Sequence, residues 1–211
     1  MTHALILIPA ALLGAWVLSG YLPTRNVEIN KYSVIAKKDG YELRRYEPYI
    51  LAETPMQDES GNSGFNELFQ YISGSNTGNS RLAMTAPVLQ SESPAGQKLA
   101  MTAPVLQTEK KGGGVMAFVM PPGIKLEELP KPASPRVTLR EVPGHKAAVL
   151  RFSGWGSTAT VKNKTQSLAA ALERDGLRAA AAPVSAFYNP PWTPPFMRRN
   201  EVMIEIEDNQ P

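Results

Sequence analysis

The sequence predicts an α+β fold in which an antiparallel sheet with two helices closes toward a distorted barrel. Runs with apolar residues at alternate positions, the period of a half-buried strand, recur along the chain. Helical spacing of apolar residues is found in only two short segments of the body. The expected order of elements, β-β-α-β-β-β followed by β-β-α-β-β, indicates two similar halves related by a pseudo-twofold axis.

Composition places the chain among globular proteins. At 211 residues it is long enough for one domain with a hydrophobic core and appended segments. Its charged fraction of 19% and hydrophobic fraction of 43% are typical of a folded protein. The net charge of +3 comes from scattered lysines and arginines without a basic helix, so no nucleic-acid partner is expected. The absence of cysteine excludes disulfides, a thiolate nucleophile and covalent haem attachment.

The amino-terminal segment is apolar. Residues 1–24 contain no Asp, Glu, Lys or Arg, and a helix over Ala4–Leu22 would be about 28 Å long, close to the thickness of a bilayer's hydrocarbon core. We therefore expect residues 1–23 to be a transmembrane helix that anchors the chain in membrane lipid as a single-pass protein. A cleaved signal peptide is the alternative. Positive charges such as Arg25 and Lys31 follow the run and none precedes it, which favours a cytoplasmic body.

Residues 24–39 are expected to be a polar tether, and residues 40–211 the folded domain. Two strands are predicted at the start of this domain, Tyr41–Tyr46 and Tyr49–Met56. They are interrupted at Pro48 because a proline cannot donate a backbone hydrogen bond to a neighbouring strand.

The first predicted helix follows these strands and ends at Gly74. Its apolar residues have the spacing of a single helical face. They are Phe65, Leu68, Phe69 and Ile72. A stripe of this kind either covers a sheet or forms the wall of a ligand pocket, and the two roles are compatible.

A repeated nonapeptide occupies the middle of the chain. LAMTAPVLQ occurs at Leu82–Gln90 and again at Leu99–Gln107, in each case with apolar residues at alternate positions. A third run, Val115–Pro121, follows the glycine-rich turn Gly112–Gly114. All three are predicted strands, and we expect the two copies of the repeat to differ in their protection within the sheet.

The second half of the domain repeats the pattern of the first. A helix is predicted to begin after Ser157 or Thr158 and to end at Gly176. Strands are predicted on both sides of it, at Val137–Val142, Lys146–Gly154, Val184–Tyr188 and Glu201–Glu207.

Catalytic and metal-binding patterns are missing from the sequence. The chain has two histidines, His3 beside the apolar run and His145 in a predicted turn, too few for a zinc site or a catalytic triad. Ser153 lies outside any nucleophile-elbow pattern. No enzymatic activity is expected, and His145 is expected to face water.

Three separated motifs resemble one protein family. The doubled AMTAPV, the MAFVMP strand and the segment YNPPWTPPFMRRNEV at Tyr188–Val202 are similar to the SOUL haem-binding family, in the bacterial branch with a doubled MTAPV motif. The resemblance implies a tetrapyrrole site on an apolar surface formed by the first helix and adjoining strands. In some relatives a histidine at the position of Arg45 is a candidate iron ligand. Arginine stays protonated and cannot take that role.

The predicted cofactor-binding residues are therefore the helix face Phe65, Leu68, Phe69 and Ile72, with three arginines for carboxylate groups: Arg45, Arg198 and Arg199. For the last two, bracing of their own loop by Asn200 and Glu201 is the structural alternative. No metal ligand is assigned.

Two functional hypotheses follow from the resemblance. In the first, the chain is a membrane-tethered protein that carries, buffers or senses haem or a related tetrapyrrole. In the second, it is a non-catalytic accessory or scaffold subunit of a membrane protein complex and holds no cofactor. The arginine at position 45 favours the second hypothesis, while the aromatic stripe leaves the first open.

Overall fold

The computed structural model describes residue 16 and residues 30–56, 62–77, 96–108 and 113–207. Its main strands are β1 (Tyr32–Lys38), β2 (Tyr41–Tyr46), β3 (Tyr49–Pro55), β5 (Val105–Thr108), β6 (Val115–Val119), β8 (Thr138–Val142), β9 (His145–Phe152), β10 (Val184–Phe187) and β11 (Asn200–Glu205). The helices are α2 (Asn62–Ser73) and α3 (Thr158–Arg174), with 3-10 turns η1 (Leu126–Glu128) and η2 (Pro195–Met197). Short strands β4 (Asn76–Thr77) and β7 (Lys131–Pro132) pair with each other.

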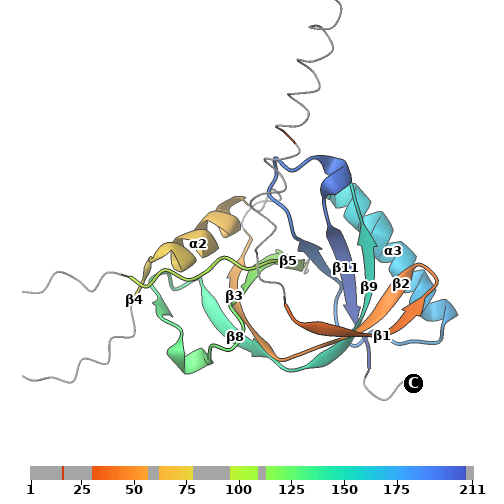
Figure 1. Ribbon diagram of the computed structural model, residues 1–211, viewed down its shortest axis with the longest axis horizontal. Coiled ribbons are helices and arrows are strands. Elements are labelled where there is room, and N and C mark those ends of the chain that lie inside the picture. Colours follow the sequence, from red (N-terminus) through yellow and green to blue (C-terminus); the bar gives the residue numbers. More distant parts are fainter. Residues whose placement is uncertain (1–15, 17–29, 57–61, 78–95, 109–112, 208–211) are drawn as a thin grey trace, which may run out of the picture.

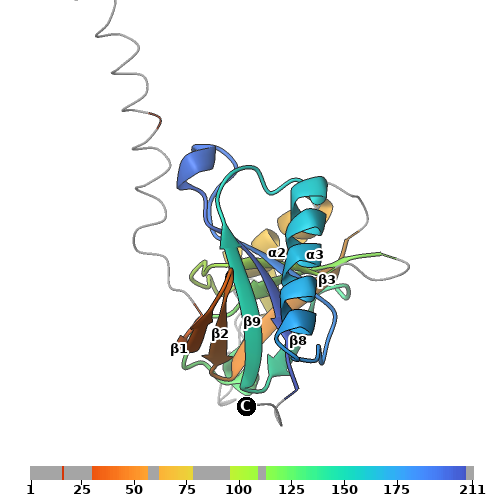
Figure 2. The same ribbon diagram turned by 90° about the vertical axis from the view of Figure 1, so that its right-hand side faces the viewer.

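The main strands form one antiparallel sheet of nine strands in the order β1-β2-β9-β11-β10-β5-β6-β3-β8. The sheet curls into a half-barrel with α2 and α3 on its outer side, as Figures 1 and 2 show. The α+β class, the antiparallel sheet and the two helices are confirmed. The predicted closure toward a barrel stops at a half-barrel, whose outermost strands are β1 and β8.

The strand order is symmetric about the β10–β5 pair. On each side follow β11 and β6, then β9 and β3, then β2 and β8. Pro48 lies between β2 and β3, and Pro143–Gly144 lies between β8 and β9. The strands are separated there because a proline has no backbone N–H to donate. Across these interruptions Tyr46 pairs with His145, and Tyr49 pairs with Val142. The two interrupted pairs therefore join the halves of the sheet.

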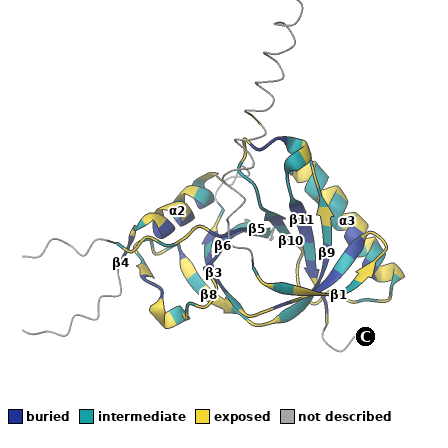
Figure 3. Ribbon diagram, viewed as in Figure 1, coloured by how far each residue is buried: buried dark blue, intermediate teal, exposed yellow. Residues whose placement is uncertain are grey.

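Each helix covers the outer face of one half. Leu68 and Ile72 of α2 pack with Ile50 and Phe118 in one buried cluster. Leu168 and Leu172 of α3 pack with strands β2, β9 and β11 in another. Figure 3 shows that burial is concentrated in the strands, while the helices expose one side. The outer face of the sheet is thus a hydrophobic core.

The predicted helix ends agree with the structure. The Ser157 side chain accepts a hydrogen bond from the Thr160 backbone N–H and so caps α3. Gly74 and Gly176 follow the two helices with φ of +117° and +71°, a conformation that glycine adopts without a steric penalty.

Two segments differ from the predictions. Residues 32–38, expected to belong to a polar tether, form β1, which pairs with β2 along its length. In the second copy of the repeat the strand begins only at Val105, directly after Pro104. The first copy, Leu82–Gln90, lies outside the described residues. The expected inequality of the two copies therefore stays a prediction.

The single-pass membrane localisation is corrected. Within the described part of the chain, no helix is long and apolar enough to cross a membrane. The predicted anchor, residues 1–23, lies outside the described residues except for Trp16. That residue donates a hydrogen bond from Nε1 to the carbonyl oxygen of Trp192 at 2.9 Å.

Candidate ligand-binding site

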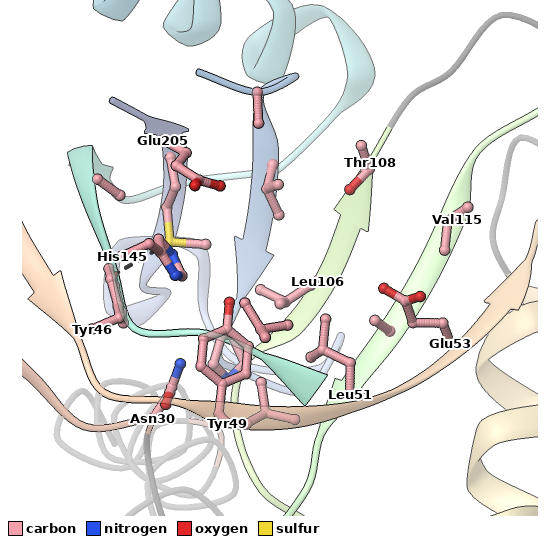
Figure 4. A pocket seen from close by; sticks show the side chains of 18 of the residues that line it. Asn30, Tyr46, Tyr49, Leu51, Glu53, Leu106, Thr108, Val115, His145 and Glu205 are labelled. Carbon is pink, nitrogen blue, oxygen red and sulfur yellow. Dashed lines mark hydrogen bonds between the residues drawn. The ribbon is translucent and has the colours of Figure 1, made fainter. Parts of the chain in front are cut away.

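The inner face of the curled sheet encloses a cavity of about 410 Å³, a volume within the range of small-molecule sites. Side chains alternate between the two faces of a strand, so residues next to those packed under the helices point into this cavity. Its apolar walls come from seven strands and include Leu51, Leu106, Ala117, Val119, Val142, Ala147, Val184 and Met203. Figure 4 shows Leu51, Leu106 and Val115 around it, together with the polar side chains described below.

Aromatic rings meet where the two halves of the sheet join. The His145 ring stacks on Tyr46 with centroids 5.4 Å apart and planes inclined by 18°, and Tyr49 lies 5.9 Å away on a tilted plane. All three line the cavity (Figure 4). His145 is half-buried and begins β9, where a turn was expected, and its exposure to water stays a prediction. The register of β2 and β9 places it beside Tyr46.

The His145 ring is held by its own turn. Its Nδ1 lies 3.0 Å from the Pro143 carbonyl oxygen. Because a carbonyl oxygen only accepts hydrogen bonds, Nδ1 is the donor in this contact, and Nε2 is the ring nitrogen that can offer a lone pair.

A buried charge cluster adjoins this aromatic region. Glu201 is 1% exposed and accepts hydrogen bonds from Arg44 at 3.0 Å, from the Tyr188 hydroxyl at 2.7 Å and from Arg199 Nε at 3.0 Å. The Arg44 guanidinium stacks on Tyr32, with its Cζ 4.3 Å from the ring centroid, and Arg199 stacks on Tyr188 at 4.0 Å. One carboxylate thus pairs with two arginines at one end of the inner face.

The tyrosines of the inner face are neutral phenols at physiological pH. Burial raises the pKa of Tyr46 to about 12, although a hydrogen bond from Arg44 acts in the opposite direction. Burial also raises the pKa of Tyr49 and of Tyr188. These residues offer hydrogen bonds and ring surfaces to a ligand, and forming a phenolate would be costly.

The opposite end of the cavity carries a more exposed ion pair. Arg140 donates two hydrogen bonds to Glu53, at 3.1 and 2.6 Å, from neighbouring strands β8 and β3. The Arg140 side chain is 54% exposed, so this pair lies at the edge of the site. A second cavity of about 660 Å³ adjoins the first and shares Asn30, Tyr49, Val119 and Val142 with it.

The residues predicted from the helix stripe lie on the other face of the sheet. Leu68 and Ile72 are buried in the core beneath α2, and Phe65 packs edge-on against Phe118 with centroids 5.3 Å apart. Phe69 is 47% exposed. None of the four lines either cavity described here, and a binding role for them stays a prediction.

The three predicted arginines are separated. Arg45 is exposed and alternates along β2 with Arg44 and Tyr46, so it points to the outer face. Arg198 stacks on Trp155 at 4.2 Å and donates hydrogen bonds to the carbonyl oxygens of Thr193 and Pro191, which braces its loop. Arg199 belongs to the charge cluster on the inner face.

Arg44 and His145 were missed by the sequence-based assignment of the site. The alternation in YELRRY contains the signal for Arg44, because Tyr41 and Leu43 on the core face put Arg44 on the opposite face. For His145 the sequence gives no comparable signal, since its neighbours across the strands depend on the register.

Comparisons with solved structures support the fold. The C-terminal domain of EcmrR aligns with a TM-score of 0.54 at 12% identity, over 83% of this chain and 98% of that domain. An uncharacterized conserved protein from Listeria innocua aligns with a TM-score of 0.52 at 14% identity, over 82% of this chain and 94% of that one. Likenesses at such low identity show the fold alone.

Sequence comparisons identify the family. No curated protein matches the chain. Residues 27–205 match the model of the SOUL heme-binding protein family, without distinguishing a branch with a doubled MTAPV motif. This match extends over both halves of the sheet, and the chain belongs to the SOUL heme-binding protein family.

Proposed function

We propose that this protein binds haem or a related tetrapyrrole on the inner face of its half-barrel and acts as a carrier, buffer or sensor without catalysing a reaction. The observation that carries the proposal is a cavity of about 410 Å³, with aliphatic walls and polar groups at its ends, in a chain of a haem-binding family. Family membership supports the ligand class, and the geometry of the cavity supports its location.

The residues of the inner face fit such a ligand. Aliphatic walls can cover the faces of a macrocycle, and the adjoining cavity gives a flat molecule room to extend. Burying a few hundred Å² of ring surface at about 25 cal/mol per Å² contributes several kcal/mol before association costs, which is compatible with micromolar affinity. When bound, haem would supply the iron and the visible absorption. The protein contributes burial, orientation and donor atoms.

A cation for the ligand's carboxylates is present at the edge of the cavity. Arg140 uses two of its N–H groups for Glu53, and a guanidinium has five. Its remaining donors and its exposed position suit a propionate that stays in contact with water. Arg199, by contrast, is occupied by the buried Glu201.

The inner face is a better candidate than the helix stripe because Leu68 and Ile72 already fill the core beneath α2. The family match also favours tetrapyrrole binding over the accessory-subunit hypothesis, which gains no support from the comparisons.

Titration of haemin into the purified protein, followed by the Soret absorption, tests the proposal. We expect saturable binding that Val142→Trp weakens by at least about tenfold, because the indole fills the space where the two cavities meet. Phe69→Ala, on the exposed side of α2, is the control and should leave the affinity within about twofold. Loss of binding in Phe69→Ala with normal binding in Val142→Trp would overturn the location. Absence of binding to the wild-type protein would overturn the function.

A further inference from the structure

We infer that His145 supplies an axial ligand to the iron of a haem bound in the inner cavity, an inference that rests on the proposed function. The residue lies at the start of β9, opposite Tyr46 of β2 and beside the point where the two halves of the sheet join. Its ring is part of the cavity wall (Figure 4).

The ring is oriented before any ligand arrives. Stacking on Tyr46 and the hydrogen bond from Nδ1 to the Pro143 carbonyl oxygen fix both its plane and its tautomer. The remaining nitrogen, Nε2, has no hydrogen-bond partner among the described residues. Metal-binding histidines commonly have this arrangement, in which one ring nitrogen donates to a carbonyl and the other binds the metal. The turn at Pro143–Gly144 thus acts as the supporting shell of the proposed ligand.

The other donors on the cavity wall are less suited to iron. The Tyr46 hydroxyl accepts a hydrogen bond from Arg44 and donates one to the Met203 sulfur, both at 3.4 Å. The Tyr46 hydroxyl oxygen and the Met203 sulfur are therefore already hydrogen-bonded. Burial raises the pKa of Tyr46 to about 12 and also raises that of Tyr49, which disfavours a tyrosinate ligand. Arg45, at the position where some relatives carry a histidine, points to the other face.

The inference assigns binding of the macrocycle and coordination of the iron to different residues. Aliphatic walls would hold any tetrapyrrole of the right size, with or without a metal, whereas His145 would act only on an iron-containing one. Protoporphyrin IX, which has no iron, therefore serves as a probe of the walls alone, and haemin as a probe of the walls and the histidine together.

The test compares wild-type protein with His145→Asn, whose side-chain amide can still donate to the Pro143 carbonyl oxygen but offers no imidazole to iron. We expect wild-type protein with haemin to give a sharp Soret band. In His145→Asn that band should broaden and shift, with affinity lowered about tenfold or more. Protoporphyrin IX fluorescence titrations should give the same affinity for both proteins within about twofold.

A second variant guards against an effect on folding. In His145→Ala, added imidazole should restore the wild-type haemin spectrum. Free imidazole can replace a missing iron ligand but cannot repair a defect in folding. Identical haemin spectra in wild-type protein and both variants would overturn the role of His145 while leaving tetrapyrrole binding intact. If neither haemin nor protoporphyrin IX binds wild-type protein, the proposed function itself fails and this inference falls with it.

Discussion

The outer and inner faces of the curled sheet are built from the same strands but differ in chemistry. On the outer face, Ala52 and Ala148 lie under helices in a closed hydrophobic core. On the inner face, their neighbours Leu51 and Ala147 line a cavity that also contains a histidine, several tyrosines and charged groups. The two-residue period of a strand therefore separates the residues that stabilise the fold from those that can contact a ligand.

The inner face is itself divided. At one end a fully buried carboxylate holds two arginines, while at the other Arg140 and Glu53 form a pair with access to solvent. The first arrangement can tolerate little change, because charges without partners are costly away from water. The second can exchange partners, which suits a position where a ligand's carboxylates would bind.

The largest effect is expected from Glu201→Leu. The substitution leaves Arg44 and Arg199 without their shared carboxylate in a buried site, and we expect the free energy of unfolding to fall by about 3–5 kcal/mol. Urea denaturation followed by circular dichroism measures it. The control is Glu53→Leu, which breaks the more exposed pair and should cost about 0–1 kcal/mol. Equal losses in the two variants would contradict the distinction between the ends of the inner face.

A substitution in the outer core should reduce stability without affecting binding. Leu68 is fully buried beneath α2, and Leu68→Ala should lower the free energy of unfolding by about 2–5 kcal/mol. Haemin affinity, measured at a temperature where the variant is folded, should change by less than about twofold. A large loss of affinity in folded Leu68→Ala protein would favour the helix stripe as the binding surface.

Alkaline pH should lower the free energy of unfolding by a smaller amount than these substitutions, through tyrosines on both faces of the sheet. Burial raises the pKa of Tyr46, on the inner face, and of Tyr71, in α2, to about 12. Each phenol holds its proton more tightly in the folded protein, so this stabilisation is complete below about pH 10 and is lost as the pH rises toward 12.

The loss of stability with pH can be measured by urea denaturation between about pH 9 and 11.5. Tyr46→Phe and Tyr71→Phe should each make the decline shallower, because each removes one group that titrates differently in the folded and unfolded states. A decline as steep as in the wild-type protein would show that the altered tyrosine does not contribute to it.

Local patterns in the sequence predicted most of the elements. The strand Tyr41–Tyr46 has the predicted bounds, and Ser157 and Gly176 mark the ends of α3 as expected. These features depend on short-range chemistry that a sequence displays directly. Strand β1 was missed because its polar residues resemble a linker, and pairing with β2 along one edge of the sheet gives it its conformation.

The site could be predicted only in part. Alternation along β2 already indicates that Arg44 and Arg45 point to opposite faces, yet Arg45 was assigned to the site because of its position in the family motif. His145 could not be placed, because its contacts with Tyr46 and Tyr49 come from strand pairing between distant parts of the chain. Sequence periodicity identifies the face of a residue but not its neighbours across the sheet.

The most direct test of the inner face as the binding surface is methyl NMR of alanine-labelled protein with haemin. Ala147 and Ala148 are adjacent on β9 and point to opposite faces, and Ala117 and Ala52 form a similar pair on β6 and β3. Paramagnetic iron broadens nearby methyl signals steeply with decreasing distance, and diamagnetic zinc protoporphyrin serves as the reference. We expect haemin to broaden the signals of Ala147 and Ala117 much more than those of Ala148 and Ala52. Stronger broadening of Ala148 and Ala52 would contradict the account and place the ligand among the helices.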